Sequence, residues 1–453
     1  MTLPDYYLAD LPPEAPLTPS MVREACCAIR HNREQYLLPW TTPGLIRLLS
    51  AVAEDWLDAA SPFRTIALTE GQTETRFSPH VLATGLDAFF RQLTYDNLDT
   101  LIAQDLGHIE RLDALVASPV EQRNQRAAMA RGPVLLAHVT AGNLPAPALL
   151  GMVLGLLTRS AQFVKCARGT SLLPRLFAQS IYEVEPKIGA CLEIAEWPGG
   201  SAPLEEALFA EADCVTATGT DETLDDIRRR LPGHVRFLGY GHRVSFGYVA
   251  REMLSRHSAP EVAARAAVDV AAWDQLGCLS PHVFYVERGG TVSPERFAEM
   301  LAEALSNQER LLPRGNPPPE DAAAIATRRA FYEVRAAHIP DTLQWCSPGS
   351  TAWTVVYDTD PEFQVSCLNR FIYVKGVHDL AGALQGAEKV RGKVSTVGLA
   401  APMSLAGKLA VDLARWGATR ICGLGQMQNP PLAWRHDGRP SLGDLVTWTD
   451  WER

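Results

Sequence analysis

The sequence lacks several patterns that would place it in a common functional class. Its nine cysteines include no C-x-x-C pair, and no H-E-x-x-H motif occurs, so neither a disulfide framework nor a zinc site is expected. It contains no P-loop, which argues against the nucleotide site of P-loop NTPases. It also contains no G-x-S-x-G motif, which argues against the serine nucleophile of an α/β-hydrolase. We therefore expect mostly buried free thiols in a reducing cytoplasm, and no metal site.

Blocks of positive charge and long apolar runs are also missing. The 42 Lys and Arg residues against 52 Asp and Glu give a net charge of −10, which disfavours a nucleic-acid or anionic-membrane partner. The first residues, MTLPDYYLAD, lack the basic-then-apolar order of a signal peptide. The most apolar run, LPAPALLGMVLGLL, is too short to span a bilayer and suits a buried helix.

The apolar pattern changes near Gly132. Before it, residues 1–130 have apolar side chains at helical spacing, most clearly over 45–57 and 81–106. After it, short apolar runs alternate with helix-like segments, which is typical of βαβ units around a parallel sheet. These runs are PVLLAHV, AQFVKC, ACLEIAEW, DCVTATG and HVRFLGYG.

A second α/β stretch follows Gly247. An apolar stripe there predicts a helix that ends near Gly277, and a strand is expected over 282–287. The stripe consists of Val262, Ala266, Val270 and Trp273. Ser293 should open another helix, and LLPRGNPPPED is expected to form a surface loop. Further strands are expected at TAWTVVYD, RFIYVKGV, KVSTVGL and TRICGL.

Polar side chains follow two neighbouring predicted strands. Asn143 lies in the loop after the first strand, and Lys165 ends the second, with Arg168 and Thr170 just beyond it. The carboxyl ends of parallel strands share one edge, so an amide and two cations would meet where a phosphorylated ligand binds. Alternatively, Asn143 is a turn residue, and Lys165 and Arg168 are solvated loop charges. The pattern alone leaves both interpretations open.

Two short glycine pairs do not decide whether the chain binds a dinucleotide. Gly239–Gly241 and Gly423–Gly425 lack the third glycine of the dinucleotide-binding fingerprint.

One thiol, Cys278, lies in WDQLGCLSPH, on the joint between a predicted helix and a predicted strand. Buried cysteines usually lie inside elements, whereas a thiol on a joint is open to a substrate as a nucleophile. The carboxyl end of a helix does not favour a thiolate, so any activating group must come from a distant part of the chain.

Four motifs in order carry a family resemblance: AGNLP with FVKCARGTSLLP, then TATGTDET, then WDQLGCLSP. They resemble the motif set of the aldehyde dehydrogenase superfamily. More narrowly, together with the tail GLGQMQNPPLAWRHDGRPSLGDLVTWTDWE, the chain resembles the fatty acyl-CoA reductases that supply aldehyde in bacterial bioluminescence. The resemblance runs from about residue 130 to the end.

The resemblance implies roles for individual residues. Cys278 matches the catalytic thiol, and Asn143 matches the asparagine that helps to form the oxyanion hole. Lys165 matches the lysine that contacts the adenosine ribose. Gly219 and Thr220 match the turn that places a helix N-terminus near the cofactor pyrophosphate. As an alternative for Thr220, Asp221 and Glu222 make an acidic first turn that stabilises a helix but repels phosphate.

The cofactor implied is NADPH. NAD-preferring relatives typically carry a glutamate three residues after the lysine, and Arg168 stands there instead. A guanidinium attracts a 2′-phosphate where a carboxylate would repel it, and Thr170 lies in the same cofactor loop.

A further departure concerns water. Hydrolytic aldehyde dehydrogenases have a glutamate base in a Glu-Leu-Gly-Gly-Lys motif, and the matching stretch here, GYGHRVSF, has Gly239 at that position. Without the carboxylate, nothing obvious activates water against an acyl-enzyme. His242 is a further candidate, for proton transfer or for stacking on the ligand. His436-Asp437 is either a catalytic pair or a turn.

These observations predict an aldehyde-dehydrogenase-like α/β fold. Residues 1–246 are expected to form a helical region and a Rossmann-type NADP-binding domain, 247–428 the catalytic domain, and 429–453 a tail. Cys278 is expected on a cleft between the two domains. The expected reaction is reduction of an acyl-CoA, or an acyl-carrier thioester, to an aldehyde by NADPH. A hydrolytic aldehyde dehydrogenase and a non-catalytic partner in an acyl-processing complex are the alternatives. The acyl group, the carrier and any homo-oligomer are left open.

Overall fold

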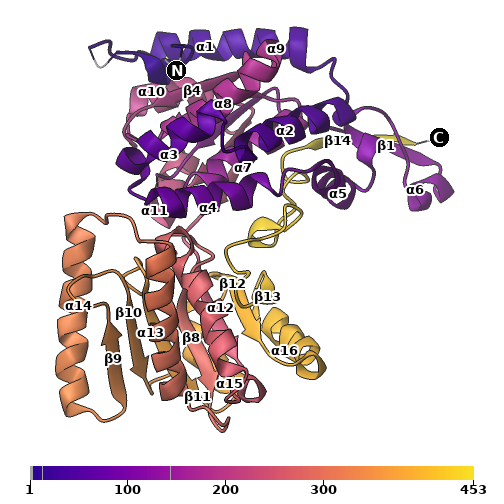
Figure 1. Ribbon diagram of the computed structural model, residues 1–453. Helices are drawn as coiled ribbons and strands as arrows, with labels where there is room; N and C mark the ends of the chain where they lie inside the picture. Colours follow the sequence, from indigo (N-terminus) through magenta and orange to yellow (C-terminus); the bar gives the residue numbers. More distant parts are fainter. Residues whose placement is uncertain (1–3, 13, 143, 453) are drawn as a thin grey trace. The chain divides into compact units, whose positions relative to one another are not determined.

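The computed structural model describes residues 4–12, 14–142 and 144–452, and it divides into two compact units. Unit 1 comprises Met1–Thr75, Leu86–Gly241 and Pro431–Arg453, and unit 2 comprises Arg76–Gly85 and His242–Pro430. Each unit is α/β structure built on a largely parallel sheet, as expected (Figure 1). The assignment of the cofactor to 1–246 and of the thiol chemistry to 247–428 stays a prediction.

Unit 1 contains a five-stranded parallel sheet with the order β4-β3-β2-β5-β6. Each of the five apolar runs after Gly132 forms one of its strands. They are β2 (Leu135–Val139), β3 (Ala161–Cys166), β4 (Leu192–Glu196), β5 (Cys214–Thr218) and β6 (Arg236–Tyr240). The chain adds β3 and β4 on one side of β2, and then β5 and β6 on the other. This reversal creates a switch point between β2 and β5, where ligands of such sheets bind at the carboxyl edge.

Helices cover both faces of this sheet. One face packs against α1 (Pro19–Asn32), α10 (Ala202–Glu211) and α11 (Asp221–Arg230). On the other lies α7 (Ala146–Leu157), whose Gly151 faces the buried ring of His138. The remaining helices that lie wholly in unit 1 are α2 (Thr42–Leu57), α3 (Pro62–Thr75), α5 (Tyr95–Leu106), α6 (Pro119–Arg123), α8 (Leu172–Val184) and α9 (Pro186–Gly189). None of the helices in the described ranges is long and apolar enough to cross a membrane.

The helical prediction for residues 1–130 holds, apart from one strand. β1 (Arg126–Arg131) pairs antiparallel with β14 (Thr447–Glu452), so that Arg126 lies opposite Glu452. Of the segment 429–453, expected as a tail, residues 431–453 therefore belong to unit 1 and 429–430 to unit 2. All six residues of β14 are exposed, and this leaves no alternation of buried and exposed positions from which a strand would be recognised.

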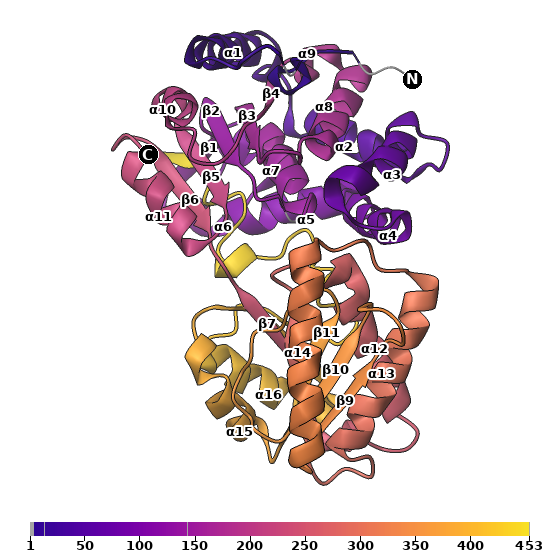
Figure 2. The ribbon, with the colours of Figure 1, turned by 90° about the vertical axis from the view of Figure 1, so that its left-hand side faces the viewer.

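Unit 2 contains a seven-stranded sheet with the order β13-β12-β7-β8-β11-β10-β9, in which only β9 runs antiparallel to its neighbour. Its strands are β7 (Val244–Val249), β8 (Pro281–Glu287), β9 (Thr342–Cys346), β10 (Thr354–Asp358), β11 (Phe371–Val377), β12 (Val394–Ala400) and β13 (Ile421–Gly423). Helices α12 (Ala259–Ala271) and α13 (Pro294–Leu311) cover one face. The other face is covered by α14 (Pro319–His338), α15 (Leu380–Gly386) and α16 (Met403–Trp416) (Figure 2). The bounds of α4, Pro79–Phe90, fall in both units.

The helix before Cys278 ends earlier than its apolar stripe predicts. α12 ends at Ala271, not near Gly277, because Trp273, Asp274 and Gln275 have φ of 50°, 49° and 66°. These left-handed residues turn the chain out of the helix. Trp273 is still buried, against the ring of Phe77, with ring centroids 5.3 Å apart. Cys278 therefore does not cap an α-helix, and the expected conflict between a thiolate and a helix dipole does not arise at this position.

Candidate active site

Lys165 lies near the carboxyl end of β3, in unit 1. It is 3% exposed, and its Nζ lies 5.9 Å from the centre of the Trp197 ring. Burial lowers the pKa of Lys165, while the carboxylates of Glu205 and Glu196 act in the opposite direction. The ammonium donates no hydrogen bond to any residue that the structure describes. The alternative that Lys165 is a solvated loop charge is therefore wrong.

Arg168 and Thr170 lie in the turn after β3. Arg168 is exposed, as either interpretation of it requires. Thr170 Oγ1 donates to the carbonyl of Ala167 at 2.8 Å, and the N–H of Gly169 donates to Glu196 Oε1 at 2.7 Å. Gly169 has a φ of 72°, a conformation that glycine adopts without strain. The exposed Arg168 thus directly precedes Gly169, whose N–H is bound by a carboxylate at the end of the next strand.

Asn143 lies outside the described residues, so its role stays a prediction. Its neighbours Gly142 and Leu144 line a small pocket with Thr170 and Glu74. Glu74 Oε1 accepts a hydrogen bond from the N–H of Leu172 at 2.7 Å, and burial raises the pKa of Glu74. Sequence reasoning missed Glu74, because it comes from α3, far away in the chain.

Gly219 and Thr220 form the turn between β5 and α11. Thr220 Oγ1 accepts a hydrogen bond from the N–H of Thr223 at 3.3 Å, which makes Thr220 the N-cap of α11. Asp221 and Glu222 follow in the first turn. This geometry supports the helix-capping interpretation of Thr220. Contact of Gly219 and Thr220 with a pyrophosphate stays a prediction.

Gly239, at the position where hydrolytic relatives have a glutamate, lies on β6. A Cβ added there would lie 3.0 Å from the Phe237 ring, which is tight for any larger residue. The Gly239 carbonyl accepts a hydrogen bond from Arg439 of the tail at 3.0 Å. Next to it, Tyr240 stacks on His436 with ring centroids 4.6 Å apart.

The structure places His436 and Asp437 in a turn. They lie in a short 3-10 turn, His436–Gly438, where Asp437 has a φ of 51°. His436 Nε2 lies 4.0 Å from Asp437 Oδ1, beyond hydrogen-bond length. Of the two interpretations, the turn fits this geometry.

Cys278, in unit 2, is partly exposed and lies between the 3-10 turn Ala272–Gln275 and β8. Its carbonyl accepts a hydrogen bond from Ser245 Oγ at 2.8 Å, and Ser245 Oγ in turn accepts one from the N–H of Thr396 at 3.1 Å. Because Ser245 lies on β7 and Thr396 on β12, two strands fix the backbone at the thiol.

The same loop is closed by a turn of its own. The N–H of Ser280 donates to the carbonyl of Gly277 at 3.0 Å, and the N–H of Gly277 donates to Ser280 Oγ at 3.2 Å. Gln428 Nε2 also donates to Ser280 Oγ. Cys278 thus projects from a turn whose neighbouring polar groups are engaged in hydrogen bonds.

Two histidines belong to the same part of unit 2. His242 is exposed, and His282, at the start of β8, is buried. Nδ1 of His282 accepts a hydrogen bond from the N–H of Ser366 at 3.1 Å, so the neutral ring carries its proton on Nε2. Burial, and then the charge of His242, lower the pKa of His282 to about 4. No motif in the sequence singles out His282, because its partner Ser366 lies 84 residues further along the chain.

The predicted residues fall into two groups. One group lies in or just after strands at the carboxyl edge of the unit 1 sheet and consists of Lys165, Arg168, Thr170, Gly219 and Thr220. The other group, Cys278 and His242, belongs to unit 2. Within the residues that the structure describes, no cluster of His, Cys, Asp or Glu is arranged to hold a metal ion. The chemistry available is a partly exposed thiol in one unit, and one buried and one exposed cation at the carboxyl edge of the sheet in the other.

Known structures share this fold. A benzaldehyde dehydrogenase from Corynebacterium glutamicum, described as NAD-dependent, has a TM-score of 0.67 at 12% identity, covering 96% of this chain and 91% of its own. Betaine aldehyde dehydrogenase from Staphylococcus aureus, in complex with NAD+, has a TM-score of 0.66 at 13% identity, covering 96% and 89%. At these identities the likeness shows the fold alone, and it confirms the expected aldehyde-dehydrogenase-like architecture.

A family model identifies the family, and named sequence relatives agree with it. The long-chain acyl-protein thioester reductase of Vibrio harveyi is 24% identical over 320 residues, covering 70% of this chain and 64% of that protein. The enzyme of the same name from Aliivibrio fischeri is 25% identical over 362 residues, covering 78% and 70%. The chain thus spans about two thirds of the length of these relatives. The model of the acyl-CoA reductase (LuxC) family matches residues 40–448, so the chain belongs to the acyl-CoA reductase (LuxC) family.

Proposed function

We propose that the chain reduces an acyl thioester to the aldehyde with NADPH, through an acyl group carried on Cys278. The observation that carries this proposal is a partly exposed thiol on a hydrogen-bonded turn, in a chain of the acyl-CoA reductase (LuxC) family. Relatives named long-chain acyl-protein thioester reductases support the thioester as the substrate class.

The thiol performs the first half of the reaction. The Cys278 thiolate attacks the thioester carbonyl, a new S–C bond forms, and the C–S bond to the carrier breaks, so that the carrier leaves as a thiolate and takes up a proton. Acyl exchange between two sulfurs needs no oxidant or reductant. Asn143 is proposed to donate a hydrogen bond to the oxygen that becomes negative in the tetrahedral intermediate.

The residues of unit 1 fit a dinucleotide cofactor. Buried Lys165 has three N–H donors and no described hydrogen-bond acceptor, and it lies at the carboxyl edge of a doubly wound sheet. Ribose hydroxyls are suitable acceptors, and exposed Arg168 is proposed to bind a 2′-phosphate. When bound, NADPH would supply a hydride to the acyl carbon, and the bond between that carbon and the Cys278 sulfur would break, which releases the aldehyde and restores the thiolate.

The acyl-enzyme must survive until it is reduced. A general base that activates water would shorten its life, and Gly239 has no side chain to provide one. The 3.0 Å approach of Phe237 to a Cβ at this position further disfavours a carboxylate there. These features favour a reductase over a hydrolytic aldehyde dehydrogenase.

The test is product analysis with the full chain. Hexadecanoyl-CoA, or a hexadecanoyl-carrier protein, is incubated with the protein and NADPH, and the products are identified by gas chromatography. The proposal predicts one hexadecanal for each NADPH oxidised; the more efficient donor identifies the carrier.

The reverse assay examines the alternatives. If hexadecanal and NADP+ gave free hexadecanoic acid in the absence of coenzyme A, the chain would be a hydrolytic aldehyde dehydrogenase. If neither direction gave a product with acyl groups of any length, the chain would be a non-catalytic partner and the proposal would be wrong.

A further inference from the structure

Two left-handed turns lie against each other beside the Cys278 loop. The first consists of Trp273, Asp274 and Gln275, and the second of Leu368, Asn369 and Arg370, with φ between 49° and 66° at all of them. None is a glycine, so each turn is unfavourable on its own and must be held by its surroundings. Such backbone clusters at sites where geometry matters more than stability.

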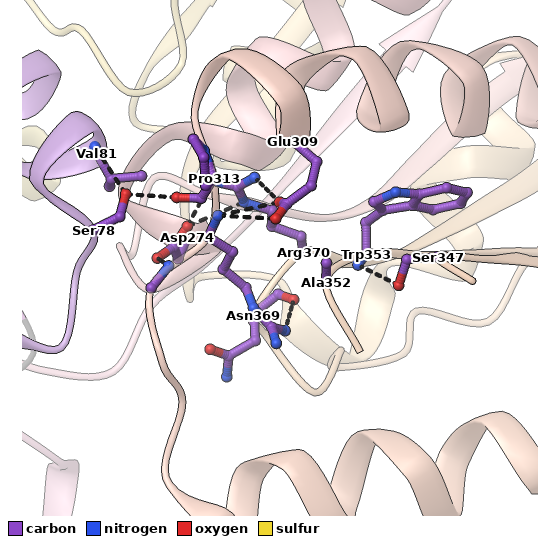
Figure 3. A network of polar contacts seen from close by, with 12 residues as sticks. Ser78, Val81, Asp274, Glu309, Pro313, Ser347, Ala352, Trp353, Asn369 and Arg370 are labelled. Carbon is purple, nitrogen blue, oxygen red and sulfur yellow. Dashed lines mark hydrogen bonds and ion pairs between the residues drawn. The ribbon is translucent and has the colours of Figure 1, made fainter. Parts of the chain in front are cut away.

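An ion pair joins the two turns. Arg370 is fully buried, and its Nη2 and Nε donate to Asp274 Oδ1 at 2.7 and 3.1 Å. Its Nη1 donates to Glu309 Oε2 at 2.7 Å. Figure 3 shows the Arg370 guanidinium with Asp274 and Glu309 beside it. The second Asp274 oxygen accepts the N–H of Gly315 at 3.0 Å, so both oxygens of this carboxylate are used.

Further hydrogen bonds connect the two turns to both ends of the loop that carries Cys278, between Gln275 and Pro281, which we call the thiol loop. Gln275 Nε2 donates to the carbonyls of Pro281 and Phe371, each at 2.8 Å. The first of these bonds closes the chain around Cys278, and the second ties it to the residue after Arg370. At the other end, His282 accepts from the N–H of Ser366 at 3.1 Å. The segment 366–371 therefore contacts the residues that bracket Cys278.

We infer that Asp274, Arg370 and Gln275 are positioning residues for Cys278: they hold its loop in the geometry from which the thiol attacks a carbonyl. This inference rests on the proposed function. The three side chains are buried and do not themselves react. They act through the backbone between Gln275 and Pro281, and Cys278 lies within that span.

Acyl transfer is sensitive to such positioning. A displacement of about 1 Å at the reacting atoms can slow an enzymatic reaction by roughly 100-fold. Asp274→Asn removes the charge that holds Arg370, and Arg370→Lys keeps the charge but loses the planar, two-nitrogen contact with Asp274. Both changes should loosen the two turns without altering any group that contacts the substrate.

The experiment measures acylation of Cys278 by hexadecanoyl-CoA in the absence of cofactor, by rapid quench and intact mass. We expect Asp274→Asn to acylate about 10- to 100-fold more slowly than the native protein. Arg370→Lys should be slower by a smaller factor. The KM for NADPH should not change in either variant, because the cofactor residues belong to the other unit.

Glu287→Gln is the matched control. Glu287 is also a buried carboxylate of unit 2 paired with an arginine, Arg251, but it lies at the far end of β8 from Cys278. Loss of this pair should lower the melting temperature and leave the acylation rate unchanged. If Glu287→Gln slowed acylation as much as Asp274→Asn, or if Asp274→Asn and Arg370→Lys acylated at the native rate, the positioning role would be wrong.

Alkylation by iodoacetamide distinguishes a loss of positioning from a folding defect, because this small reagent needs only an accessible thiolate. Positioning predicts that Asp274→Asn reacts with iodoacetamide at Cys278 within a fewfold of the native rate, with an unchanged pH profile. Should Asp274→Asn not fold, Arg370→Lys alone decides, since native acylation by it would overturn the inference. If the native protein itself failed to acylate at Cys278, the proposed function would fail first.

Discussion

Two regions are built in opposite ways: the thiol loop of unit 2, and the carboxyl edge of the unit 1 sheet, which is the proposed cofactor edge. Around Cys278, the polar groups of the loop pair with Ser245, with Gln428 and with the buried Arg370, which come from three distant segments. At the edge of the unit 1 sheet, Lys165 is buried without a described hydrogen bond, and Arg168 is exposed. The protein thus fixes the backbone at its proposed nucleophile by itself, whereas Lys165 and Arg168, the proposed cofactor cations, have no described hydrogen-bond acceptor.

The energetic reasons differ as well. Each non-glycine residue in the left-handed region costs roughly 1–2 kcal/mol. Removal of one partner from a buried ion pair typically costs about 3–5 kcal/mol, so we expect the two turns beside Cys278 to depend on the Arg370–Asp274 pair that joins them. A buried ammonium also destabilises the fold, and a bound ligand offsets that cost where it accepts hydrogen bonds. The thiol loop is thus expected to be rigid in the free protein. Ligand binding should stabilise the cofactor edge.

The largest effect on activity is expected when the thiol of unit 2 is removed. Cys278→Ala should abolish NADPH oxidation with hexadecanoyl-CoA while the fold is retained, as judged by circular dichroism. Cys214→Ala is the matched control, because Cys214 is a buried thiol on β5 whose pKa burial raises to about 12. It should lower stability at most. Activity in Cys278→Ala would refute the covalent mechanism.

The next effect concerns the oxyanion. Asn143→Ala should lower kcat by about 10²–10³, the usual consequence of losing one donor, with a much smaller change in the KM for NADPH. Asn124→Ala, at an exposed asparagine that ends α6, serves as the control. If only the KM for NADPH rose, Asn143 would belong to the cofactor site.

Cofactor choice comes third. A charge-assisted hydrogen bond from Arg168 contributes ~1.5–3 kcal/mol, so NADPH should be preferred over NADH by about 10- to 150-fold in kcat/KM. Arg168→Glu should remove or reverse this preference, whereas Arg123→Glu, at another exposed arginine, should not. Equal efficiency with both cofactors, unchanged by Arg168→Glu, would exclude Arg168 from the site.

Some of this organisation was predictable from the sequence. All five strands of the unit 1 sheet follow from short apolar runs, and Lys165 was placed correctly at a strand end. The left-handed turns were not predictable, because only Asp274 and Asn369 among their six residues are of types enriched in that backbone. Asp274 and Arg370 are 96 residues apart, so only the folded sheet brings them together. The exposed strand β14 lacks the alternation that identifies a strand.

A fourth prediction concerns the pH dependence of the free energy of unfolding and the buried His138 in the core of unit 1. His138 hydrogen-bonds Thr216 and Gln162, and burial lowers its pKa to about 4. Because the folded pKa lies below the unfolded value of about 6.5, the contribution of His138 is present above pH 6.5 and is lost as the pH falls toward 4. His138→Gln should therefore be destabilised at pH 7.

That deficit should shrink by roughly 1–2 kcal/mol at pH 5. Urea unfolding at both values of pH checks this expectation, with exposed His31→Gln as the control. A deficit for His138→Gln that stayed constant with pH would show that this histidine does not titrate on unfolding.

The smallest effect separates the two roles of Thr220. Loss of an N-cap costs about 1 kcal/mol, so Thr220→Ala should lower the free energy of unfolding by that amount and leave the KM for NADPH nearly unchanged. Thr94→Ala removes the equivalent cap of α5, away from the cofactor edge. A rise in the KM for NADPH in Thr220→Ala alone would instead assign Thr220 to the cofactor.

Intact mass spectrometry tests the central claim most directly. The native protein is mixed with hexadecanoyl-CoA without cofactor, quenched in acid, weighed, and digested to locate the adduct. The account predicts a gain of one hexadecanoyl group on the peptide that contains Cys278, none in Cys278→Ala, and its loss when NADPH is added before quenching. An unchanged mass with acyl-CoAs of every length, or an adduct on any other cysteine, would contradict it.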